Sequence, residues 1–352
     1  MAKSAKVSGM FALAAEHEPL PHGGDLAAAR RLFPGAPQPF IDLSTGINPF
    51  PYRLPRLPAE AFARLPDPAA CDALRAIAAR AYGAPSPAHV VVAPGTQILL
   101  PLVAGLVPPG RAAVIAPSYG EFARAAALAG HDVTRVSDLA GTEEARLVIV
   151  ANPNNPDGRV SDAGDLRALA ASLRGAGGLL VVDEAFMDVG PPGGTLAGAV
   201  DGGNIVVLRS FGKFFGLAGL RLGFALAAPS LAARLAALLG PWAASGAALA
   251  VGARALADPA WIEQTKKRLA RSALRLDALL IEAGLEVVGG TPLFRLVRTP
   301  AAAALFRHLG GAGILVRPFA DHADWLRFGL PANKQAWLRL QIALTSFTAT
   351  HR

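Results

Sequence analysis

The 352-residue sequence has a single cysteine and few charged residues. One cysteine, Cys71, excludes an intrachain disulfide and a zinc site built from several thiolates. It lies in an early turn of a predicted helix, so we interpret it as a structural thiol and not as a nucleophile. Charged residues make up only 17% of the chain and hydrophobic residues 52%. This composition excludes an intrinsically disordered chain and indicates a well-packed globular protein.

The sequence also lacks an apolar run long enough to cross a membrane without charges or prolines. Residues 1–16 contain two lysines and one short apolar run, 9–15, with no convincing cleavage pattern. We therefore expect neither a signal peptide nor a membrane anchor, and we expect a cytoplasmic protein.

Lysine is scarce, whereas arginine is abundant, and the net charge is 34 − 26 = +8. A basic balance suits nucleic acid, a membrane surface or small anionic ligands. The arginines are scattered, and no basic run is interleaved with aromatic residues as a nucleic-acid-binding face requires. We therefore expect a small phosphorylated or carboxylated ligand, and no nucleic acid, membrane or metal ion as partner.

The order of the predicted elements indicates an α/β fold. Short, continuous apolar runs alternate with alanine-rich helices, which is typical of a mainly parallel sheet covered by helices on both faces. One predicted helix starts at Pro68 and stops at Tyr82, before Gly83, and another covers 97–106. The predicted strands of this sheet are 89–93, 112–116, 132–136, 147–151, 179–182, 205–209 and 224–227.

We divide the chain into three parts. Residues 1–65 are rich in proline and form an arm with turns, which we expect to pack against the small domain and the active site. Residues 66–230 form a three-layer large domain, and 231–352 supply a linking helix and a smaller α+β domain. The predicted elements of the smaller domain are strands 285–288, 294–297, 314–316 and 325–329 and a final helix around 333–344.

One lysine lies among small and apolar residues, in Ser-Phe-Gly-Lys-Phe-Phe-Gly at 210–216. Apolar surroundings lower the pKa of a lysine, and the neutral amine of Lys213 can then attack a carbonyl. The commonest carbonyl partner of such a lysine is pyridoxal 5'-phosphate (PLP). Ser210 and Arg221 would suit the phosphate of that cofactor, by a hydroxyl hydrogen bond and by fork-shaped charge pairing. A glycine-rich surface loop with a solvated lysine is the alternative.

Polar residues follow directly after three predicted strands, at Asn152, Asp183 and Ser210. Ligands of parallel sheets gather at the carboxyl ends of the strands. The carboxylate of Asp183 can keep a pyridinium nitrogen protonated, which makes the ring an electron sink, although an ordinary helix cap is the alternative. The amide of Asn155 can donate to a ring oxygen, although the string Asn-Pro-Asn-Asn-Pro-Asp-Gly at 152–158 is also a plausible turn.

Four motifs in this order resemble those of the fold-type I PLP enzymes of the class I and II aminotransferase group. The motifs are Asn-Pro-Asn-Asn-Pro-x-Gly at 152–158, Asp-Glu-Ala-Phe at 183–186, Ser-Phe-x-Lys at 210–213 and Gly-Leu-Arg-Leu-Gly at 219–223. The resemblance covers essentially the whole chain and implies that Lys213 bonds covalently to the cofactor. It also implies that Asp183 pairs with the ring nitrogen and Asn155 with the ring oxygen. Ser210 and Arg221 would hold the phosphate, and the assembly would be a homodimer.

Two further segments resemble parts of the cofactor site of this family. Pro-Gly-Thr-Gln at 94–97 opens a predicted helix after a strand, where phosphate is attracted. Candidate cofactor contacts there are Gly95, the backbone of Thr96 and the side chain of Gln97. Tyr119 follows the next strand, where the family has an aromatic ring stacked on PLP, so we take it as catalytic together with Lys213 and Asp183. The alternatives are a helix-surface position for Gln97 and a core position for Tyr119.

Within the group, the chain resembles the histidinol-phosphate aminotransferases and the threonine-phosphate decarboxylases of cobalamin biosynthesis. The arm favours the decarboxylases, because His-Gly-Gly-Asp at 22–25 and Ile-Asp-Leu-Ser-Thr-Gly-Ile-Asn-Pro at 41–49 resemble their pattern. Glycines let backbone amides approach an anion, and a histidine beside them adds a donor, so the substrate phosphate would lie here. An exposed histidine in a mobile turn is the alternative. The candidate substrate ligands of the arm are His22, Gly23, Gly24, Ser44 and Asn48.

Trp-Leu-Arg-Phe-Gly-Leu-Pro at 325–331 resembles the segment that carries the substrate-binding arginine of the family. Arg327 would bind an α-carboxylate bidentately, beside Asn155, and Arg317 would orient the substrate or pack structurally. The implied reaction is decarboxylation of L-threonine O-3-phosphate to (R)-1-amino-2-propanol O-2-phosphate. The alternatives are transamination of the histidinol-phosphate type, which would use nearly the same residues, and a non-catalytic PLP-fold binding protein.

The sequence departs from the family at one position. The family commonly has a tyrosine in Arg-Tyr-Pro-Asp-Pro, which reaches the cofactor phosphate of the neighbouring subunit. Here Leu65 takes that place in Arg-Leu-Pro-Asp-Pro at 64–68, so the hydroxyl is missing. Either Tyr52 or a water replaces it, or the phosphate is bound more weakly.

Overall fold

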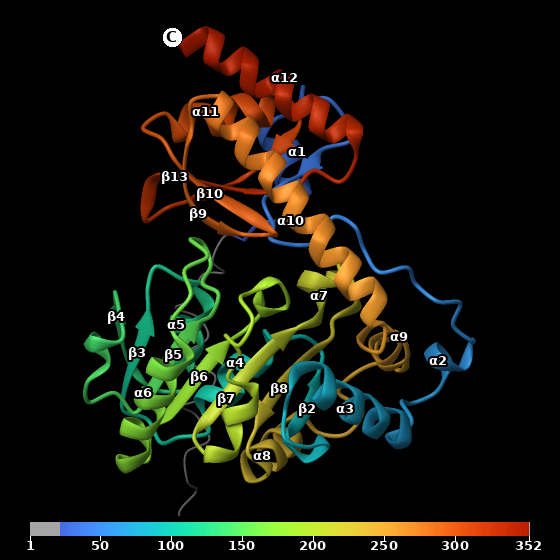
Figure 1. Ribbon diagram of the computed structural model, residues 1–352, viewed down its shortest axis with the longest axis vertical. Helices are drawn as coiled ribbons and strands as arrows, with labels where there is room; N and C mark the ends of the chain where they lie inside the picture. Colours follow the sequence, from blue (N-terminus) through green and yellow to red (C-terminus); the bar gives the residue numbers. More distant parts are fainter. Residues whose placement is uncertain (1–21, 352) are drawn as a thin grey trace, which may run out of the picture.

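The computed structural model describes residues 22–351, so the expectations for residues 1–21 of the arm lie outside the described residues (Figure 1). A seven-stranded sheet forms the centre of the larger part. Six strands share one direction, and β8 runs antiparallel to both of its neighbours, which confirms the predicted mainly parallel sheet. The strand order is β2 (Val90–Ala93), β8 (Gly223–Ala227), β7 (Ile205–Ser210), β6 (Leu179–Asp183), β5 (Leu147–Ala151), β3 (Arg111–Ile115) and β4 (Asp132–Val136).

Helices cover both faces of this sheet, which gives the large part its three layers. Successive side chains of a strand point to opposite faces. Accordingly, Val148 and Val150 join one buried cluster, whereas Leu147 and Ile149 join the other. The helices that pack on the first cluster are α3 (Pro68–Tyr82), α6 (Ala163–Gly175) and α9 (Gly246–Leu256), and those on the second are α4 (Leu99–Ala104), α5 (Glu121–Leu128) and α8 (Pro229–Leu239).

The ends of α3 agree with the prediction, but α4 is shorter than predicted. Asp67 caps α3 by accepting a hydrogen bond from the backbone of Ala69, and Gly83 ends it in the left-handed region with φ 77°. The predicted helix 97–106 begins only at Leu99. Pro101 has no N–H to donate to the carbonyl of Gln97, so the first helical bond forms later in the chain. Gln97 therefore lies in a turn before the helix.

A smaller antiparallel sheet lies above the large part in Figure 1. Its strands, in order, are β12 (Arg317–Phe319), β13 (His322–Gly329), β10 (Phe294–Arg298) and β9 (Glu286–Thr291), and it is covered by α11 (Ala302–Gly311) and α12 (Lys334–His351). The predicted strand 314–316 is wrong in its extent, because β11 is only Ile314–Leu315. This strand pairs in parallel with β1 (Ile41–Asp42) instead of joining the four-stranded sheet. The arm is thereby attached to the smaller part.

The long helix α10 (Pro259–Glu282) runs from the large part to the smaller one (Figure 1). The remaining elements are α1 (Leu26–Leu32), α2 (Glu60–Ala63), α7 (Phe211–Phe214) and 3-10 turns at Pro87–His89, Ala140–Thr142, Met187–Val189, Ala197–Gly202 and Ala218–Leu220. The division of the chain at 65/66 and 230/231 stays a prediction.

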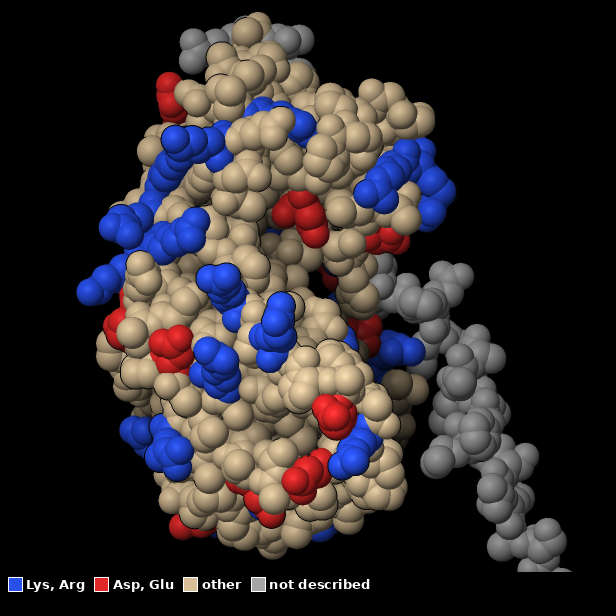
Figure 2. Space-filling view, turned by 90° about the vertical axis from the view of Figure 1, so that its right-hand side faces the viewer, with Lys and Arg blue, Asp and Glu red and all other residues tan. Residues whose placement is uncertain are grey.

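Figure 2 shows the basic side chains spread over both lobes of one face, with uncharged surface between them. Among residues 22–351, no helix is both long and apolar enough to cross a bilayer.

Candidate active site

The carboxyl ends of β5, β6 and β7 place the predicted polar residues at one edge of the sheet. Asn152 follows β5 directly, as predicted, and its N–H donates to the carbonyl oxygen of Asp183 at 2.9 Å. The strands β6 and β7 extend one residue further than predicted, because Asp183 pairs with Leu208 and Ser210 pairs with Gly223. Asp183 and Ser210 are therefore the last residues of their strands.

Lys213 lies in the short helix α7 at this edge, and its Nζ is 5.8 Å from the centre of the Phe186 ring. The pKa of Lys213 is lowered to about 8, chiefly by burial and also by the positive charges of Arg327 and Arg221, while the charge of Asp183 partly opposes this shift. Near pH 8 a large share of this amine is therefore neutral. Such an amine can act as a nucleophile and as a proton carrier.

Asp183 lies close enough to Lys213 for their charges to interact. Burial raises the pKa of Asp183 to about 6, against the lowering effects of the Ala185 N–H, which donates to Oδ1 at 3.1 Å, and of the Lys213 charge. At neutral pH the carboxylate is therefore mainly ionised although it is poorly solvated. A buried anion of this kind is stabilised by a cationic partner, which a protonated pyridine ring would provide.

Asn155 contacts Arg327, although the two residues are 172 positions apart. Arg327 donates through Nη1 to Oδ1 of Asn155 and through Nη2 to the carbonyl oxygen of Ser44, the latter at 2.7 Å. Because a guanidinium can only donate, Asn155 presents its oxygen to Arg327. Its Nδ2 is thereby left as a donor, which is the role that the sequence predicts for it toward a ring oxygen.

Arg327 is buried, with 7% of its surface exposed. Its Nε has no hydrogen-bond partner within residues 22–351. Burial lowers the pKa of Arg327 to about 10, and the charge of Arg317 adds to this effect. Burial also lowers the pKa of Arg317. A poorly solvated guanidinium with an unpartnered Nε–H is suited to an anionic ligand.

Two glycines allow the backbone of 94–97, the end of β7 and Arg221 to approach one another. A Cβ added to Gly95, which has φ 89°, would lie 2.7 Å from Nη2 of Arg221. A Cβ on Gly223 would lie 2.7 Å from the backbone nitrogen of Thr96. Gly223 pairs with Ser210 in the sheet. The structure thus brings together a guanidinium, a hydroxyl and backbone N–H groups, a donor set that fits a phosphate group.

Tyr119 and Gln97 lie beside this cradle and are bonded to each other. The Tyr119 hydroxyl donates to Oε1 of Gln97 at 3.0 Å. Burial raises the pKa of Tyr119 to about 12, and the charges of Glu121 and Asp183 act in the same direction. The phenol therefore stays protonated at neutral pH, which suits a stacking ring that donates a hydrogen bond and does not suit a base.

The arm reaches the site through its first described residue. Nε2 of His22 lies 3.3 Å from Oε1 of Glu121, and the His22 and Tyr119 rings are 5.6 Å apart between centres. Gly23 packs closely, since a Cβ on it would lie 2.5 Å from the carbonyl oxygen of Ser44. The arm is thus held against the large part on one side and against β13, through Ser44 and Arg327, on the other.

Three of the predicted substrate ligands already use polar atoms within the protein. The N–H of Gly24 donates to Oγ of Ser44 at 2.7 Å, and this hydroxyl donates to Oδ1 of Asp42 at 2.6 Å. Asn48 donates through Nδ2 to the carbonyl oxygen of Phe214 at 2.7 Å. The backbone N–H of Asn48 donates to the carbonyl oxygen of Lys213 at 2.9 Å. The two Asn48 bonds connect the arm to α7, the short helix that carries Lys213.

Sequence reasoning missed three charged residues around the site. Glu121 is buried beside Gln97, and Glu184 pairs with Arg209 at 2.9 Å directly behind Asp183. Glu184 follows Asp183 in the sequence, so its place at the end of the strand could be predicted. Its ion pair with Arg209 could not be predicted, because the two residues are distant in the sequence. Glu121 had no distinguishing signal, because a glutamate in the first turn of a helix is common on protein surfaces.

The missing tyrosine at Leu65 has no evident replacement within one chain. Leu65 is 68% exposed. The Tyr52 hydroxyl donates to Oδ2 of Asp258 at 3.2 Å, and burial raises the pKa of Tyr52. The structure therefore gives no support to Tyr52 as the substitute.

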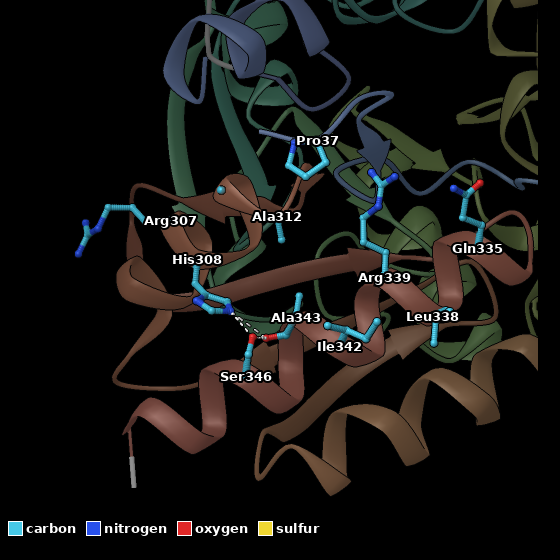
Figure 3. A pocket seen from close by; sticks show the side chains of 11 residues that line it. Pro37, Arg307, His308, Ala312, Gln335, Leu338, Arg339, Ile342, Ala343 and Ser346 are labelled. Carbon is cyan, nitrogen blue, oxygen red and sulfur yellow. Dashed lines mark hydrogen bonds between the residues drawn. The ribbon is translucent and has the colours of Figure 1, made fainter. Parts of the chain in front are cut away.

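A separate groove lies on the smaller part, between α11 and α12 (Figure 3). It has a volume of about 680 Å³, and Arg307, Arg339 and Leu338 are among its lining residues. It shares no lining residue with the site described above.

Comparison with known proteins agrees with this geometry. The family model for aminotransferase class I and II matches residues 39–347. The threonine-phosphate decarboxylase of Sinorhizobium sp is 45% identical over 332 residues, which is 93% of this chain and 98% of that protein. The protein of the same name from Pseudomonas aeruginosa is 41% identical over 331 residues, which is 93% of this chain and 98% of that protein.

A solved structure has the same fold. Histidinol-phosphate aminotransferase from Sinorhizobium meliloti, in complex with pyridoxal-5'-phosphate, matches with a TM-score of 0.81 and 24% identity. The match covers 99% of this chain and 100% of that one. From the family match and the two long relatives, we conclude that the chain belongs to the class I and II aminotransferase family.

Proposed function

We propose that this chain is a PLP-dependent decarboxylase of L-threonine O-3-phosphate. The products would be CO2 and (R)-1-amino-2-propanol O-2-phosphate, for cobalamin biosynthesis. The observation that carries this choice is the 45% identity to a threonine-phosphate decarboxylase over nearly the full length of both chains. The pairing of Asn155 with a buried Arg327 supports a PLP site, because a guanidinium that could bind a carboxylate is bonded to the amide proposed for the cofactor, although this pairing suits the decarboxylase and the aminotransferase alike.

The cofactor-binding residues follow from the arrangement at the strand ends. Lys213 would hold PLP covalently, with Asp183 at the ring nitrogen and Asn155 at the ring oxygen. The phosphate would lie between Arg221 and the backbone of Thr96. The other proposed contacts are Ser210 to the phosphate, Gly95 at the phosphate loop, and Tyr119 with Gln97 at the ring face.

Bound PLP supplies an electron sink for the electron pair of the bond that breaks at Cα. Arg327 would bind the α-carboxylate through two N–H groups and so set which bond of Cα stands perpendicular to the ring. The amine of Lys213, with its pKa of about 8, would move a proton to Cα after CO2 has left. Asp183 would keep the ring nitrogen protonated throughout.

The substrate phosphate would be bound on the arm side of the site, opposite the cofactor phosphate. His22 and the backbone N–H of Gly23 would supply donors there, and Arg317 would add a charge that is partly buried. Gly24 would act by fixing the arm, because its N–H donates to Oγ of Ser44. Ser44 and Asn48 would act by fixing the arm, because their side chains are bonded to Asp42 and Phe214.

We further propose a homodimer, in which the exposed apolar residues of the 54–65 segment would be covered by the second copy. Leu54, Phe62 and Leu65 are 59%, 71% and 68% exposed in one chain. Light scattering on the purified protein tests this assembly, and a monomeric mass would contradict it. The cytoplasmic location expected from the sequence stays a prediction.

One assay separates decarboxylation from transamination. The purified protein, saturated with PLP, is incubated with L-threonine O-3-phosphate in the presence and absence of 2-oxoglutarate, and both CO2 and glutamate are measured. We expect CO2 release at the same rate in both samples. Turnover that requires 2-oxoglutarate would reject the decarboxylase in favour of an aminotransferase. Binding of PLP without turnover in either sample would reject L-threonine O-3-phosphate as the substrate, and absence of turnover with histidinol phosphate and 2-oxoglutarate as well would indicate the non-catalytic alternative.

A further inference from the structure

Glu121 is a buried carboxylate that the proposed mechanism does not use, and Gln97 is the one proposed cofactor contact to which it is hydrogen-bonded within residues 22–351. It is the first residue of α5 and only 4% exposed. Two of its contacts are hydrogen bonds to Oε2, from Nε2 of Gln97 at 2.9 Å and from Nη1 of Arg124 at 3.1 Å. The third is Nε2 of His22, 3.3 Å from Oε1. A buried carboxylate is tolerated when donors surround it in this way.

These contacts fix the orientation of the Gln97 amide. An ionised carboxylate can only accept hydrogen bonds, so Gln97 must present its NH2 group to Glu121. Its oxygen therefore faces Tyr119, and the phenol becomes the donor of the bond between them. The direction of the Tyr119 hydroxyl, and with it the setting of the ring, thus depends on a carboxylate two positions further along the chain.

The same carboxylate holds the arm. With Nε2 of His22 directed at Glu121, Nδ1 is the ring nitrogen that remains for a ligand. The His22 ring is tilted by 43° to the Tyr119 ring, and its side chain is 43% exposed, so the contact lies at the open side of the site.

We propose that Glu121 is a positioning residue that couples the arm to the cofactor-facing ring. By fixing His22 and Gln97 together, it sets the gap between the arm and Tyr119, into which the phosphorylated end of the substrate fits. Loss of this carboxylate would weaken substrate binding more than the chemical step, because Lys213 and Asp183 do not contact it. The substrate part of this inference rests on the proposed function.

The first test does not depend on the identity of the substrate. Hydrogen–deuterium exchange is measured on the holoenzyme for the unaltered protein, Glu121→Gln and His22→Ala. We expect exchange of the amides at 23–32 to become faster by about fivefold or more in both variants, with α7 unchanged. Glu144→Gln, which alters an exposed glutamate paired with Arg111, is the matched control. Unchanged exchange at 23–32 in Glu121→Gln would overturn the proposal. If Glu121→Gln does not fold, unchanged exchange at 23–32 in His22→Ala would overturn it.

The second test is a double-mutant cycle on the KM for L-threonine O-3-phosphate. We expect Glu121→Gln and His22→Ala each to raise KM by about five- to tenfold with kcat changed less than about twofold. The double variant should be no worse than the more impaired single variant. If the two increases in KM multiply in the double variant, or if only kcat falls, the proposed coupling would be overturned. A wrong substrate would show as no turnover by the unaltered protein, with the exchange result still standing.

Discussion

The two sides of the candidate site are built differently. On the side of the large part, Asp183 and Lys213 are half-buried and shift each other's pKa values. On the arm side, the His22 side chain is 43% exposed. It contacts the site through one polar contact, with Glu121, and through the ring of Tyr119. The side with Asp183 and Lys213 therefore has the shielded charges and shifted pKa values that are typical of catalytic groups. The arm has the exposed polar groups that are typical of a ligand-binding surface.

From this difference we expect some substitutions to change the rate of the chemical step and others to change the affinity for the substrate. Changes among the buried groups at the strand ends should remove the chemical step, because no solvent can replace them. Changes in the arm should alter binding of the substrate and the stability of the arm, with the reacting groups intact.

The largest effect is expected for Lys213→Ala. This change removes both the covalent attachment of the cofactor and the proton carrier at Cα, so kcat should fall by roughly 10³-fold or more. Steady-state CO2 release measures it. Lys266→Ala, which alters an exposed lysine paired with Glu263, is the control and should leave kcat unchanged. Retention of more than a tenth of the activity by Lys213→Ala would break the proposed division of roles.

A smaller but specific loss is expected for Arg327→Lys. An ammonium group keeps the charge but cannot bind a carboxylate with two parallel N–H bonds while it also replaces the two guanidinium bonds to Asn155 and Ser44 with the same fixed geometry. We expect kcat/KM for L-threonine O-3-phosphate to fall by about 10- to 100-fold. Arg298→Lys, in an exposed pair with Glu286, is the matched control. Equal effects of the two changes would contradict a binding role for Arg327.

The pKa of Lys213 predicts how the apoprotein captures PLP as pH changes. The neutral amine is the reacting form, so the rate of covalent capture should rise about tenfold per pH unit below pH 8 and level off above it. Because Asp183 raises the pKa of Lys213, Asp183→Asn should move the break to lower pH. Stopped-flow absorbance gives both profiles. A break near pH 10, or a shift to higher pH in the variant, would show that the two groups do not share one buried pocket.

The smallest effect is expected in the arm, for Ser44→Ala. The Ser44 hydroxyl is buried between Asp42 and the N–H of Gly24, so its removal leaves the Gly24 N–H without this acceptor and takes from Asp42 Oδ1 one of the two hydrogen bonds that Ser44 donates to it. We expect a loss of about 1–3 kcal/mol in the free energy of unfolding and a change in kcat below about twofold. Urea denaturation measures the first quantity. Ser137→Ala, at an exposed serine bonded to Asp138, should change stability by less than about 0.5 kcal/mol. A strong fall in kcat would assign the arm a part in the chemistry.

Much of the large domain could be predicted because its signals are local. The strands 132–136 and 147–151 coincide with β4 and β5, and α3 ends at Tyr82, before Gly83, as predicted. Asp183, Ser210 and Lys213 fall at one sheet edge because parallel strands all end there.

The remaining features depend on contacts between distant parts of the chain. The contact between Asn155 and Arg327 forms only when β13 lies over the loop after β5. The pairing of β1 with β11 joins two-residue strands that have no periodicity to detect. Glu121 is contacted by His22 of the arm, which is distant in the sequence, and no local sequence pattern predicts this contact.

The central claim is that the strand ends form one PLP site around Lys213. The most direct measurement is reduction of the PLP-loaded protein with borohydride, followed by peptide mass mapping. The sequence has six lysines, so each can be followed separately. The account predicts a phosphopyridoxyl group on Lys213 alone, in one copy per chain. Attachment at another lysine, such as Lys334, or no attachment at all would contradict it.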